Sequence, residues 1–401
     1  MNLELLAPAG DMEKLKTALH FGADAVYFAG TQMGLRAFAG NFTSQEIPQA
    51  VKLCHDLNKK AYVTVNVFAY NDDFDVLPDY LAELKEAKVD GIIVSDPGII
   101  ALARKDFPDL DVHVSTQANL TNAYAVRFWA EHGVKRVVLA REMSLKEIAK
   151  THELLGDSVE LEAFCHGAMC ISYSGRCLLS NYLMGRDANR GECVQACRWE
   201  YVFHEKKRDN LPLTMSEDER GTYVMNSKDL CMIHHLKEMA DAGVTSFKIE
   251  GRMKTPYYLA TVVNAYRRAF DALKNGEDAD LYPELLKAGH RGYTTGFFYK
   301  ETDRDNVCLD SPQATQTHDF VARVLGYDEA RGAYVEQRNR FMCGDELEIL
   351  SPDGNFNKII KVDEMCDEDG TAVSDAKLVQ QKLWLRTDVR LNTGDILRKK
   401  K

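Results

Sequence analysis

Short apolar runs separated by amphipathic stretches fill the first two-thirds of the chain. The runs are rich in Val, Ile, Leu and Tyr and are apolar enough to be covered on both faces, which is typical of strands in a parallel sheet. We expect strands at Leu3–Leu6, Ala25–Phe28, Ala61–Val67, Gly91–Ser95, Val112–Thr116, Arg136–Ala140, Val159–Phe164 and Ser246–Glu250. Between them, apolar residues recur at helical spacing, for example over 121–131 and 144–152. The pattern predicts alternating strands and helices.

Three of the helical stretches end in a glycine that is followed at once by a strand. These glycines are Gly22, Gly133 and Gly243, and glycine accepts the left-handed conformation at which many helices end. Eight strands joined in this way predict an α/β fold, a (β/α)8 barrel of the TIM type, with functional residues at the carboxyl ends of the strands. A dinucleotide-binding open sheet is less favoured, because no GxGxxG motif follows the first strand.

The pattern changes after a last long helix that ends near residue 275. We interpret 276–318 as a connector, and beyond it apolar and polar residues alternate in short runs, at 321–325, 332–336, 345–349, 358–362 and 383–385. Short alternating runs with turns between them predict a small all-β barrel or sandwich over 319–401. The basic end, Arg398–Lys401, is predicted to be a frayed, solvated tail. The predicted division is therefore 1–275, 276–318 and 319–401.

Composition and charge exclude several classes of protein. Of 401 residues, 45% are hydrophobic and 28% charged, as in ordinary globular proteins. Asp and Glu total 61 against 50 Lys and Arg, a net charge of −11 that excludes a uniformly basic nucleic-acid binder but not a local basic patch. We see neither a signal peptide nor an apolar run of membrane-spanning length, so we expect a cytoplasmic protein.

Four of the ten cysteines fall in an insertion between the seventh and eighth predicted strands, at 166–208. Cys170, Cys177, Cys193 and Cys197 have the spacing C-x6-C-x15-C-x3-C. In a reducing cytoplasm clustered cysteines more often hold metal than form disulfides, and four thiolates suit zinc or a 4Fe–4S cluster. Structural zinc sites usually contain two tight cysteine pairs and this segment has one, which favours iron–sulfur and leaves zinc as the alternative.

The sequence around these cysteines resembles a known family. The segment Glu162-Ala-Phe-Cys-His-Gly-Ala-Met-Cys-Ile-Ser-Tyr-Ser-Gly-Arg-Cys-Leu-Leu-Ser180 is similar to the signature of peptidase family U32. The opening Leu6-Ala-Pro-Ala-Gly10, the later Asn226-Ser-Lys-Asp-Leu230 and Lys248-Ile-Glu-Gly-Arg-Met-Lys254 also match family motifs. The similarity covers nearly the whole chain, and within the family it is closest to the branch of tRNA hydroxylation proteins.

The resemblance implies a function. That branch is linked to oxygen-independent formation of 5-hydroxyuridine at the tRNA wobble position, with prephenate as the hydroxyl source and a 4Fe–4S cluster as cofactor. It implies Cys170, Cys177, Cys193 and Cys197 as ligands, although another branch takes its fourth ligand elsewhere, which leaves Cys231 as the alternative to Cys197. Implied partners are the tRNA anticodon region and a small dicarboxylate donor, with room for a partner protein of the same family and no membrane.

Polar residues near the ends of the predicted strands are candidates for binding and proton transfer. They are Asn66, Asp96, Gln117, Asn119, Arg141, His166, Glu250 and Arg252. Arginine binds carboxylates in bidentate fashion, so Arg36, Arg141 and Arg252 are candidates for a dicarboxylate, unless Arg141 and Arg252 pair with Glu142 and Glu250. His166 and Glu250 are candidate acid/base groups, with a structural anchor as the alternative for His166.

The insertion also has features suited to RNA. From Arg176 to Arg208 there are seven basic and four acidic side chains, a local charge of +3. Candidates for stacking on an unpaired base are Tyr173, Tyr182, Trp199, Tyr201 and Phe203, with packing of the insertion onto the barrel as the alternative, favoured for Trp199 and Phe203. With Gln117, Tyr173 completes the predicted substrate-binding set.

Two other functions remain open. A peptidase needs an activated nucleophile or a metal-bound water, and the chain has neither an HExxH nor a GxSxG motif. Cysteines bound to a metal would also be poor nucleophiles, so proteolysis, the activity for which older family members are named, ranks second to hydroxylation. A zinc-stapled RNA-binding protein without catalysis is the third interpretation.

Overall fold

The computed structural model describes residues 3–34, 40–170, 172–199, 216–218, 221–223, 227–299 and 314–401. Contacts divide the chain into two compact units. The first consists of Met1–Leu15, Ala23–Lys254 and His290–Ala314, and the second of Lys16–Gly22, Thr255–Gly289 and Thr315–Lys401. No helix among these residues has the length and apolar character needed to cross a membrane.

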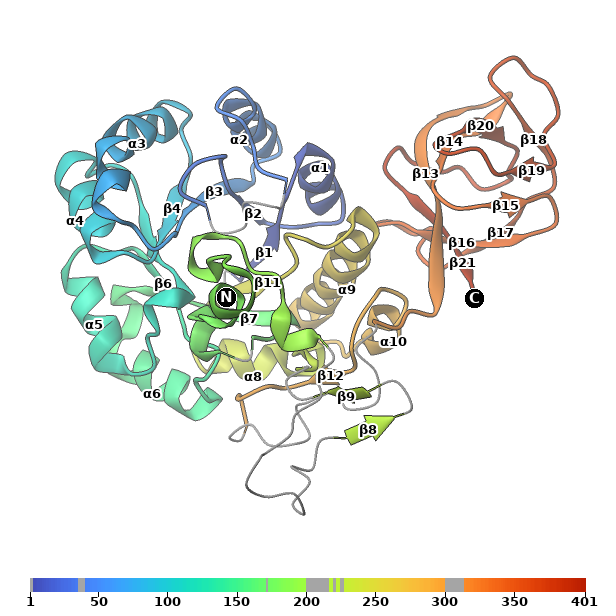
Figure 1. Ribbon diagram of the computed structural model, residues 1–401. Coiled ribbons are helices and arrows are strands. Elements are labelled where there is room, and N and C mark those ends of the chain that lie inside the picture. The colour runs from blue at the N-terminus through green and yellow to red at the C-terminus, as the bar shows by residue number, and fades with distance from the viewer. Residues whose placement is uncertain are drawn as a thin grey trace. The chain divides into compact units, whose positions relative to one another are not determined.

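A closed barrel of parallel strands forms the first unit (Figure 1). Its strands are β1 (Glu4–Pro8), β2 (Ala25–Phe28), β3 (Lys60–Val65), β4 (Gly91–Val94), β5 (Val112–Val114), β6 (Arg136–Val138), β7 (Glu160–Ala168) and β11 (Val244–Ile249). They follow one another in that order, and the barrel closes where β11 pairs with both β7 and β1. The predicted (β/α)8 barrel and its eight strands are confirmed, with small shifts at the strand ends.

Helices follow the strands in chain order. They are α1 (Met12–His20), α2 (Glu46–Asp56), α3 (Leu77–Glu86), α4 (Pro97–Asp106), α5 (Ala123–Glu131), α6 (Leu145–Leu155), α8 (Leu236–Asp241) and α9 (Pro256–Asn275). Asn122 and Ser144 cap α5 and α6, each accepting a hydrogen bond from a backbone N–H of the first turn. The expected helix-ending glycine is confirmed at Gly243. Its φ is +100°, and a Cβ atom there would clash with the side chain of His152.

Charged side chains occupy the inside of the barrel. Glu162 on β7 is fully buried; its Oε1 accepts a hydrogen bond from Lys248 Nζ at 2.7 Å and its Oε2 one from Arg136 Nη1 at 3.2 Å. Arg136 also pairs with Glu4 and Glu160 at 2.5 and 2.6 Å. The strands β1, β6, β7 and β11 are therefore joined by side chains as well as by backbone hydrogen bonds.

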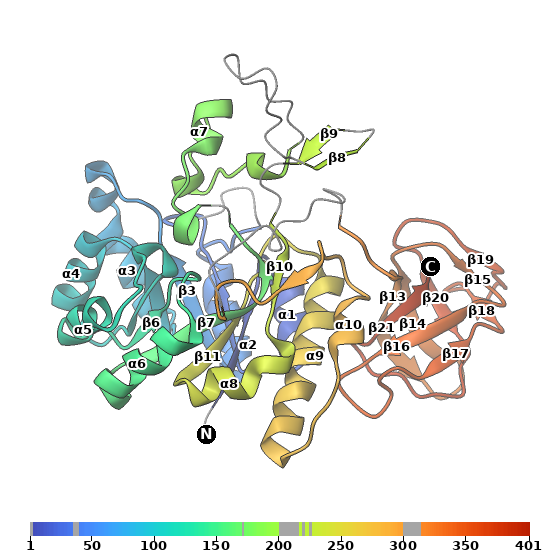
Figure 2. The ribbon, with the colours of Figure 1, turned by 90° about the horizontal axis from the view of Figure 1, so that it is seen from below.

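The predicted insertion leaves the barrel after β7. It contains the short helix α7 (Leu179–Met184). The two-stranded pair β8 (Ser216–Asp218) and β9 (Gly221–Tyr223) follows beyond the predicted bounds of 166–208. The chain then returns as β10 (Asp229–Cys231), which pairs antiparallel with the end of β7, and β12 (Tyr293–Thr294) adds to β10. Figure 2 shows α7 on the side of the barrel opposite the chain's N-terminal end, where the strands have their carboxyl ends.

The second unit contains the C-terminal β domain, as predicted. Seven strands form one antiparallel sheet, and β15 (Phe341–Met342) pairs with β19 (Asp375–Ala376). The seven are β13 (His318–Asp328), β14 (Gly332–Gln337), β16 (Glu346–Leu350), β17 (Ile359–Lys361), β18 (Met365–Cys366), β20 (Lys382–Leu385) and β21 (Ile396–Lys400). One cluster of buried apolar side chains, including Val321, Phe341 and Leu383, forms their core. The short helix α10 (Tyr282–Leu285) belongs to this unit.

The prediction of a frayed basic tail is wrong. Residues 396–400 form β21, which pairs with β13 and β16, and Arg398 is fully buried. Its guanidinium donates hydrogen bonds to Glu348 Oε1 at 2.6 Å, Glu284 Oε2 at 2.6 Å and Asn357 Oδ1 at 2.7 Å. These partners lie far away in the sequence, so local composition gives no sign of them.

Replacing Arg398 with methionine is expected to lower the free energy of unfolding by about 3 kcal/mol, as when a buried ion pair loses one partner. Lys287 still contacts both carboxylates, which limits the loss. Urea denaturation measures the change. Lys401→Met, which removes a solvent-exposed pair with Asp319, is the control and should cost less than about 1 kcal/mol. Equal losses in the two variants would contradict the burial argument.

Candidate active site

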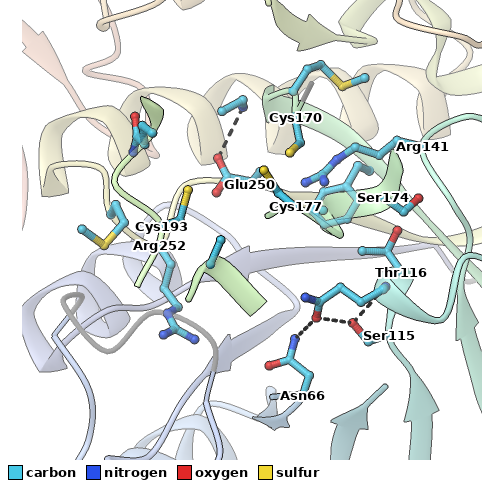
Figure 3. Close-up of a pocket in the computed structure, with 18 of the residues that line it drawn as sticks. Asn66, Ser115, Thr116, Arg141, Cys170, Ser174, Cys177, Cys193, Glu250 and Arg252 are labelled. Atoms are coloured by element: carbon cyan, nitrogen blue, oxygen red, sulfur yellow. Dashed lines mark hydrogen bonds between the residues drawn. The ribbon is translucent and has the colours of Figure 1, made fainter. Parts of the chain in front are cut away.

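A cavity of about 230 Å³ lies at the carboxyl ends of the barrel strands. Its wall combines strand ends, including Thr64, Ser115 and Lys248, with the cysteine segment, defined here as residues 170–199. Figure 3 shows Arg141, Glu250 and labelled cysteines around this space. This is the end of the fold at which TIM-barrel enzymes carry their active sites.

The four predicted ligands, Cys170, Cys177, Cys193 and Cys197, all line the cavity. Burial raises the pKa of the Cys170 and Cys197 thiols, the nearby thiols add to the rise, and Arg141 and Arg198 oppose it. The described cysteines are all free thiols. Within the described ranges, no three His, Cys, Asp or Glu side chains are spaced to hold a metal ion.

The alternative ligand, Cys231, lies elsewhere. It is buried on β10, opposite His166 in the antiparallel pairing with β7, and it is not part of the cavity wall. Its thiol instead adds to the effect of burial in raising the pKa of Cys165. Cys165 is fully buried as well, and its thiol donates to the carbonyl oxygen of Lys248 at 3.5 Å.

Hydrogen bonds from the cysteine segment attach it to the barrel rim. Arg190 donates to both carboxylate oxygens of Asp73, at 2.7 and 3.0 Å, and these bonds lower the pKa of Asp73. Ser174 donates to Glu142 through its backbone N–H at 2.6 Å and its hydroxyl at 2.5 Å. Glu142 is thus bound to the cysteine segment, whereas the alternative interpretation paired it with Arg141.

Cations dominate the cavity wall. They are Arg141, Arg198, Lys248, Arg252 and Lys254, and Glu250 is the one carboxylate among the described wall residues. Arg141 places its guanidinium carbon 3.9 Å from the centre of the Phe164 ring. Arg252 donates to Thr64 Oγ1 at 3.3 Å and to Asn41 Oδ1 at 3.2 Å. An anion is the natural ligand for such a wall.

Two amide side chains and a carboxylate supply the remaining polar groups. Asn66 Nδ2 donates to Gln117 Oε1 at 3.0 Å, and both residues line the cavity. Glu250 accepts a hydrogen bond from the backbone N–H of Ala168 at 3.3 Å. Each side-chain amide carries both donors and acceptors, which suits the edge of a base.

Two predicted site residues are not part of the cavity wall, and a third lies outside the described residues. His166 is buried, and burial, with Lys254 and His290 nearby, lowers its pKa to about 3. Tyr173 is 54% exposed outside the cavity. Arg36 lies outside the described residues.

Other candidates have structural roles or lie on the surface. Asp96 caps α4, accepting from the backbone N–H groups of Gly98 and Ile99, and Asn119 ends a short 3-10 helix with a φ of +57°. Tyr182 and Trp199 are exposed on the cysteine segment, and Tyr201 and Phe203 lie outside the described residues.

Sequence reasoning missed Lys248, Thr64 and Arg198 as wall residues. A signal for Lys248 existed. Side chains alternate between the two faces of a strand, so Ser246, Lys248 and Glu250 share a face with one another. Ser246 donates a hydrogen bond to the buried Glu162, and Glu250 lines the cavity. Lys248, between them on the strand, therefore lies between the buried charges of the barrel interior and the cavity.

Comparison with known proteins gives consistent matches over both units. A family model described as "Peptidase family U32" matches residues 10–307, and one described as "Peptidase family U32 C-terminal domain" matches 316–398. The chain is 42% identical to "tRNA hydroxylation protein P1" of Bacillus subtilis (strain 168), covering 99% of this chain and 95% of that protein. It is 36% identical to "tRNA hydroxylation protein P" of Escherichia coli (strain K12), covering 98% and 96%. It is 33% identical to "Collagenase" of Porphyromonas gingivalis (strain ATCC BAA-308 / W83), covering 88% and 87%.

His166→Gln is expected to weaken the dependence of stability on acid pH. The folded chain protonates His166 only near pH 3, against about 6.5 for an unfolded chain. The stability due to neutral His166 is therefore complete above pH 6.5 and is lost as the pH falls, by up to about 1.4 kcal/mol per pH unit. Urea denaturation between pH 7.5 and pH 4.5 measures this slope. His132→Gln, at the exposed residue that follows α5, is the control and should keep the slope of the parent chain.

Proposed function

The chain belongs to peptidase family U32, as its resemblance predicted, and from this premise we propose that it is an enzyme that hydroxylates a uridine of tRNA. Relatives named as tRNA hydroxylation proteins match nearly its whole length. The observation that carries the proposal is the convergence of four cysteines and five cations on one cavity at the barrel rim. In full, the proposed reaction is oxygen-independent, forms 5-hydroxyuridine at the wobble position and takes its hydroxyl group from prephenate.

The charge of the cavity supports an anionic donor. The guanidinium carbon of Arg141 lies 3.9 Å from the centre of the Phe164 ring, and Figure 3 shows the guanidinium directed toward Cys170 and Cys177. In the described part of the chain no carboxylate forms an ion pair with Arg141, so its hydrogen-bond donors remain available to a ligand. We assign to Arg141 the binding of a donor carboxylate. Arg252, held by Thr64 and Asn41, contributes positive charge from the opposite wall.

The cysteine thiols match the donor set of a 4Fe–4S cluster or a zinc ion. We propose Cys170, Cys177, Cys193 and Cys197 as the ligands, with Cys197 preferred to Cys231 because only Cys197 lines the cavity. The thiols would have to move closer together than they lie here. A bound iron–sulfur cluster would supply electron transfer beside the substrate.

Other wall residues would bind the substrate and move its protons. Asn66 and Gln117 are placed to hold the edge of a uracil, and Glu250 is the carboxylate that accepts or returns a proton. His166 is too deeply buried for that task. Because its carbonyl oxygen accepts a hydrogen bond from the Glu250 backbone N–H at 2.8 Å, we assign His166 to the positioning of Glu250.

An RNA substrate must present an unstacked base. A uridine reaches a barrel cavity only after it leaves its stack, and single-stranded loops such as the anticodon loop allow this at low cost. Tyr182 and Trp199, exposed on the cysteine segment that forms part of the cavity wall, offer aromatic faces to a base. A tRNA substrate implies a cytoplasmic location, and a partner protein of the same family remains part of the proposal.

Proteolysis is the second candidate, because one relative is named a collagenase. A peptidase would need an activated nucleophile. Cys165, next to His166 in sequence, is fully buried with a raised pKa, which leaves its thiol protonated and out of reach. Peptide cleavage that survives removal of all four cavity cysteines would favour this candidate over hydroxylation.

Loss of a cavity group should abolish the modified nucleoside. In a host that lacks its own tRNA hydroxylation protein, we expect the parent chain to restore 5-hydroxyuridine in tRNA, measured by nucleoside mass spectrometry. Cys193→Ser, which removes a proposed cluster ligand, and Arg141→Met, which removes a charged group that binds the donor, should each reduce it at least about tenfold. Lys150→Met, at an exposed site on α6, is the control. No modified nucleoside with the parent chain would refute the proposed function.

Metal analysis of protein purified without air decides the cofactor. A 4Fe–4S cluster predicts about four iron atoms and about four sulfide ions per chain. Cys197→Ser should lose them, and Cys231→Ser should retain them. One zinc ion per chain with tRNA binding but no modification would instead support the zinc-stapled RNA-binding protein.

A further inference from the structure

The Lys248 ammonium group lies at the junction of the barrel interior and the cavity. Its position on β11 directs it inward, where it donates a hydrogen bond to Glu162 Oε1 at 2.7 Å, and it is 96% buried, with 4% of its surface exposed, yet part of the cavity wall. An ammonium group has three N–H donors. Within the described residues, the bond to Glu162 is the only hydrogen bond of the Lys248 ammonium group.

Aromatic rings line the other sides of this ammonium group. Lys248 Nζ lies 4.2 Å from the centre of the Tyr27 ring and 5.7 Å from that of Phe164. Arg141 contacts the same Phe164 ring from 3.9 Å. Two cations therefore share one aromatic ring at the inner end of the cavity, and both retain hydrogen-bond donors. Burial lowers the pKa of Lys248, with Glu162 opposing that effect.

The buried Lys248 and the half-buried Arg141 repel each other unless an anion lies between them. Glu162 balances Lys248 from below but is also shared with Arg136. Arg141 has no such carboxylate among the described residues. A carboxylate that entered the cavity over Phe164 would accept hydrogen bonds from both Lys248 and Arg141 and would remove their repulsion.

We propose that Lys248 is a specificity-determining residue that binds, together with Arg141, one carboxylate of the anionic co-substrate. The inference rests on the proposed function and deepens it, because it selects the pair of cations that holds the donor. Arg252, which sequence reasoning selected for this task, is hydrogen-bonded to Thr64 and Asn41. In Figure 3 it extends away from the sulfur atoms of Cys170 and Cys177.

The test is the affinity of the full chain for prephenate, measured by isothermal titration calorimetry. Lys248→Met should weaken binding at least about tenfold, because it removes a charged hydrogen-bond donor from a desolvated site. Lys248→Met also removes one of the cations that pair with the buried Glu162, so it can destabilise the fold. Two further variants at Glu162 therefore separate the effect on binding from the effect on folding. Glu162→Gln keeps the ammonium group and should retain the parent affinity within about threefold. Glu162→Gln with Lys248→Met should lose affinity as the single Lys248 variant does.

Thermal unfolding of each variant shows which of them are folded, and the double variant replaces Lys248→Met if the single change does not fold. Parent-like affinity in a folded Lys248 variant overturns the inference. Equal losses in Glu162→Gln and Lys248→Met overturn it too, because they assign the effect to the ion pair. So does a parent chain that binds no prephenate. The proposed function fails separately, when the parent gene leaves cellular tRNA without hydroxyuridine.

Discussion

The carboxylate of Glu162 is the constraint on which the barrel depends. It has no exposed surface, and a buried carboxylate is stable only when paired and hydrogen-bonded. Its partners, Arg136 and Lys248, lie on the two strands that flank β7, and β7 with β11 is the pair that closes the barrel. Ser246 then links Glu162 to Glu4 on β1. A single buried charge thus fixes which strands meet at the closure.

The same charge sets the electrostatics along the barrel axis. Below Lys248, cations and carboxylates are paired, as Arg136 is with Glu4 and Glu160. On the described cavity wall, by contrast, Lys248 and four other cations face one carboxylate. The whole chain has a net charge of −11, whereas this wall carries a net positive charge. An anion is therefore attracted to this end of the barrel. Attachment of the cysteine segment through Arg190 and Ser174 places the thiols over that end.

Local patterns in the sequence predict the parts of this structure that depend on local interactions. Apolar runs and glycine-ended helices predicted the eight strands. The rule that TIM-barrel enzymes carry their sites at the carboxyl ends of the strands placed Cys170 and Cys197, 27 positions apart, at one cavity. Side-chain direction in loops was not predictable. Tyr173 lies outside the cavity because Ser174, with a φ of +43°, turns the chain and binds Glu142.

Long-range pairing was the second limit. Arg398 was predicted to lie in a solvated tail because its hydrogen-bond partners Glu284 and Glu348 are distant in the sequence. Lys248 looked like an ordinary strand residue for the same reason, since its partner is 86 positions away. The surroundings of a charged residue in a strand are therefore better predicted from the residues two positions away, which share its face of the strand, than from its immediate neighbours in sequence.

The thiols bear on the choice between the two activities named in this family. A nucleophilic cysteine needs a lowered pKa, supplied by a cation or a helix N-terminus. Burial instead raises the pKa of Cys170 and Cys197, and the neighbouring thiols raise both further, because ionised sulfurs would repel one another. This repulsion disfavours a thiolate at Cys170 or Cys197 that would attack a peptide. It is removed when a positive centre lies among the sulfurs, because metal binding displaces their protons together. The feature that makes these cysteines poor nucleophiles is therefore the one that suits them as a shared ligand set.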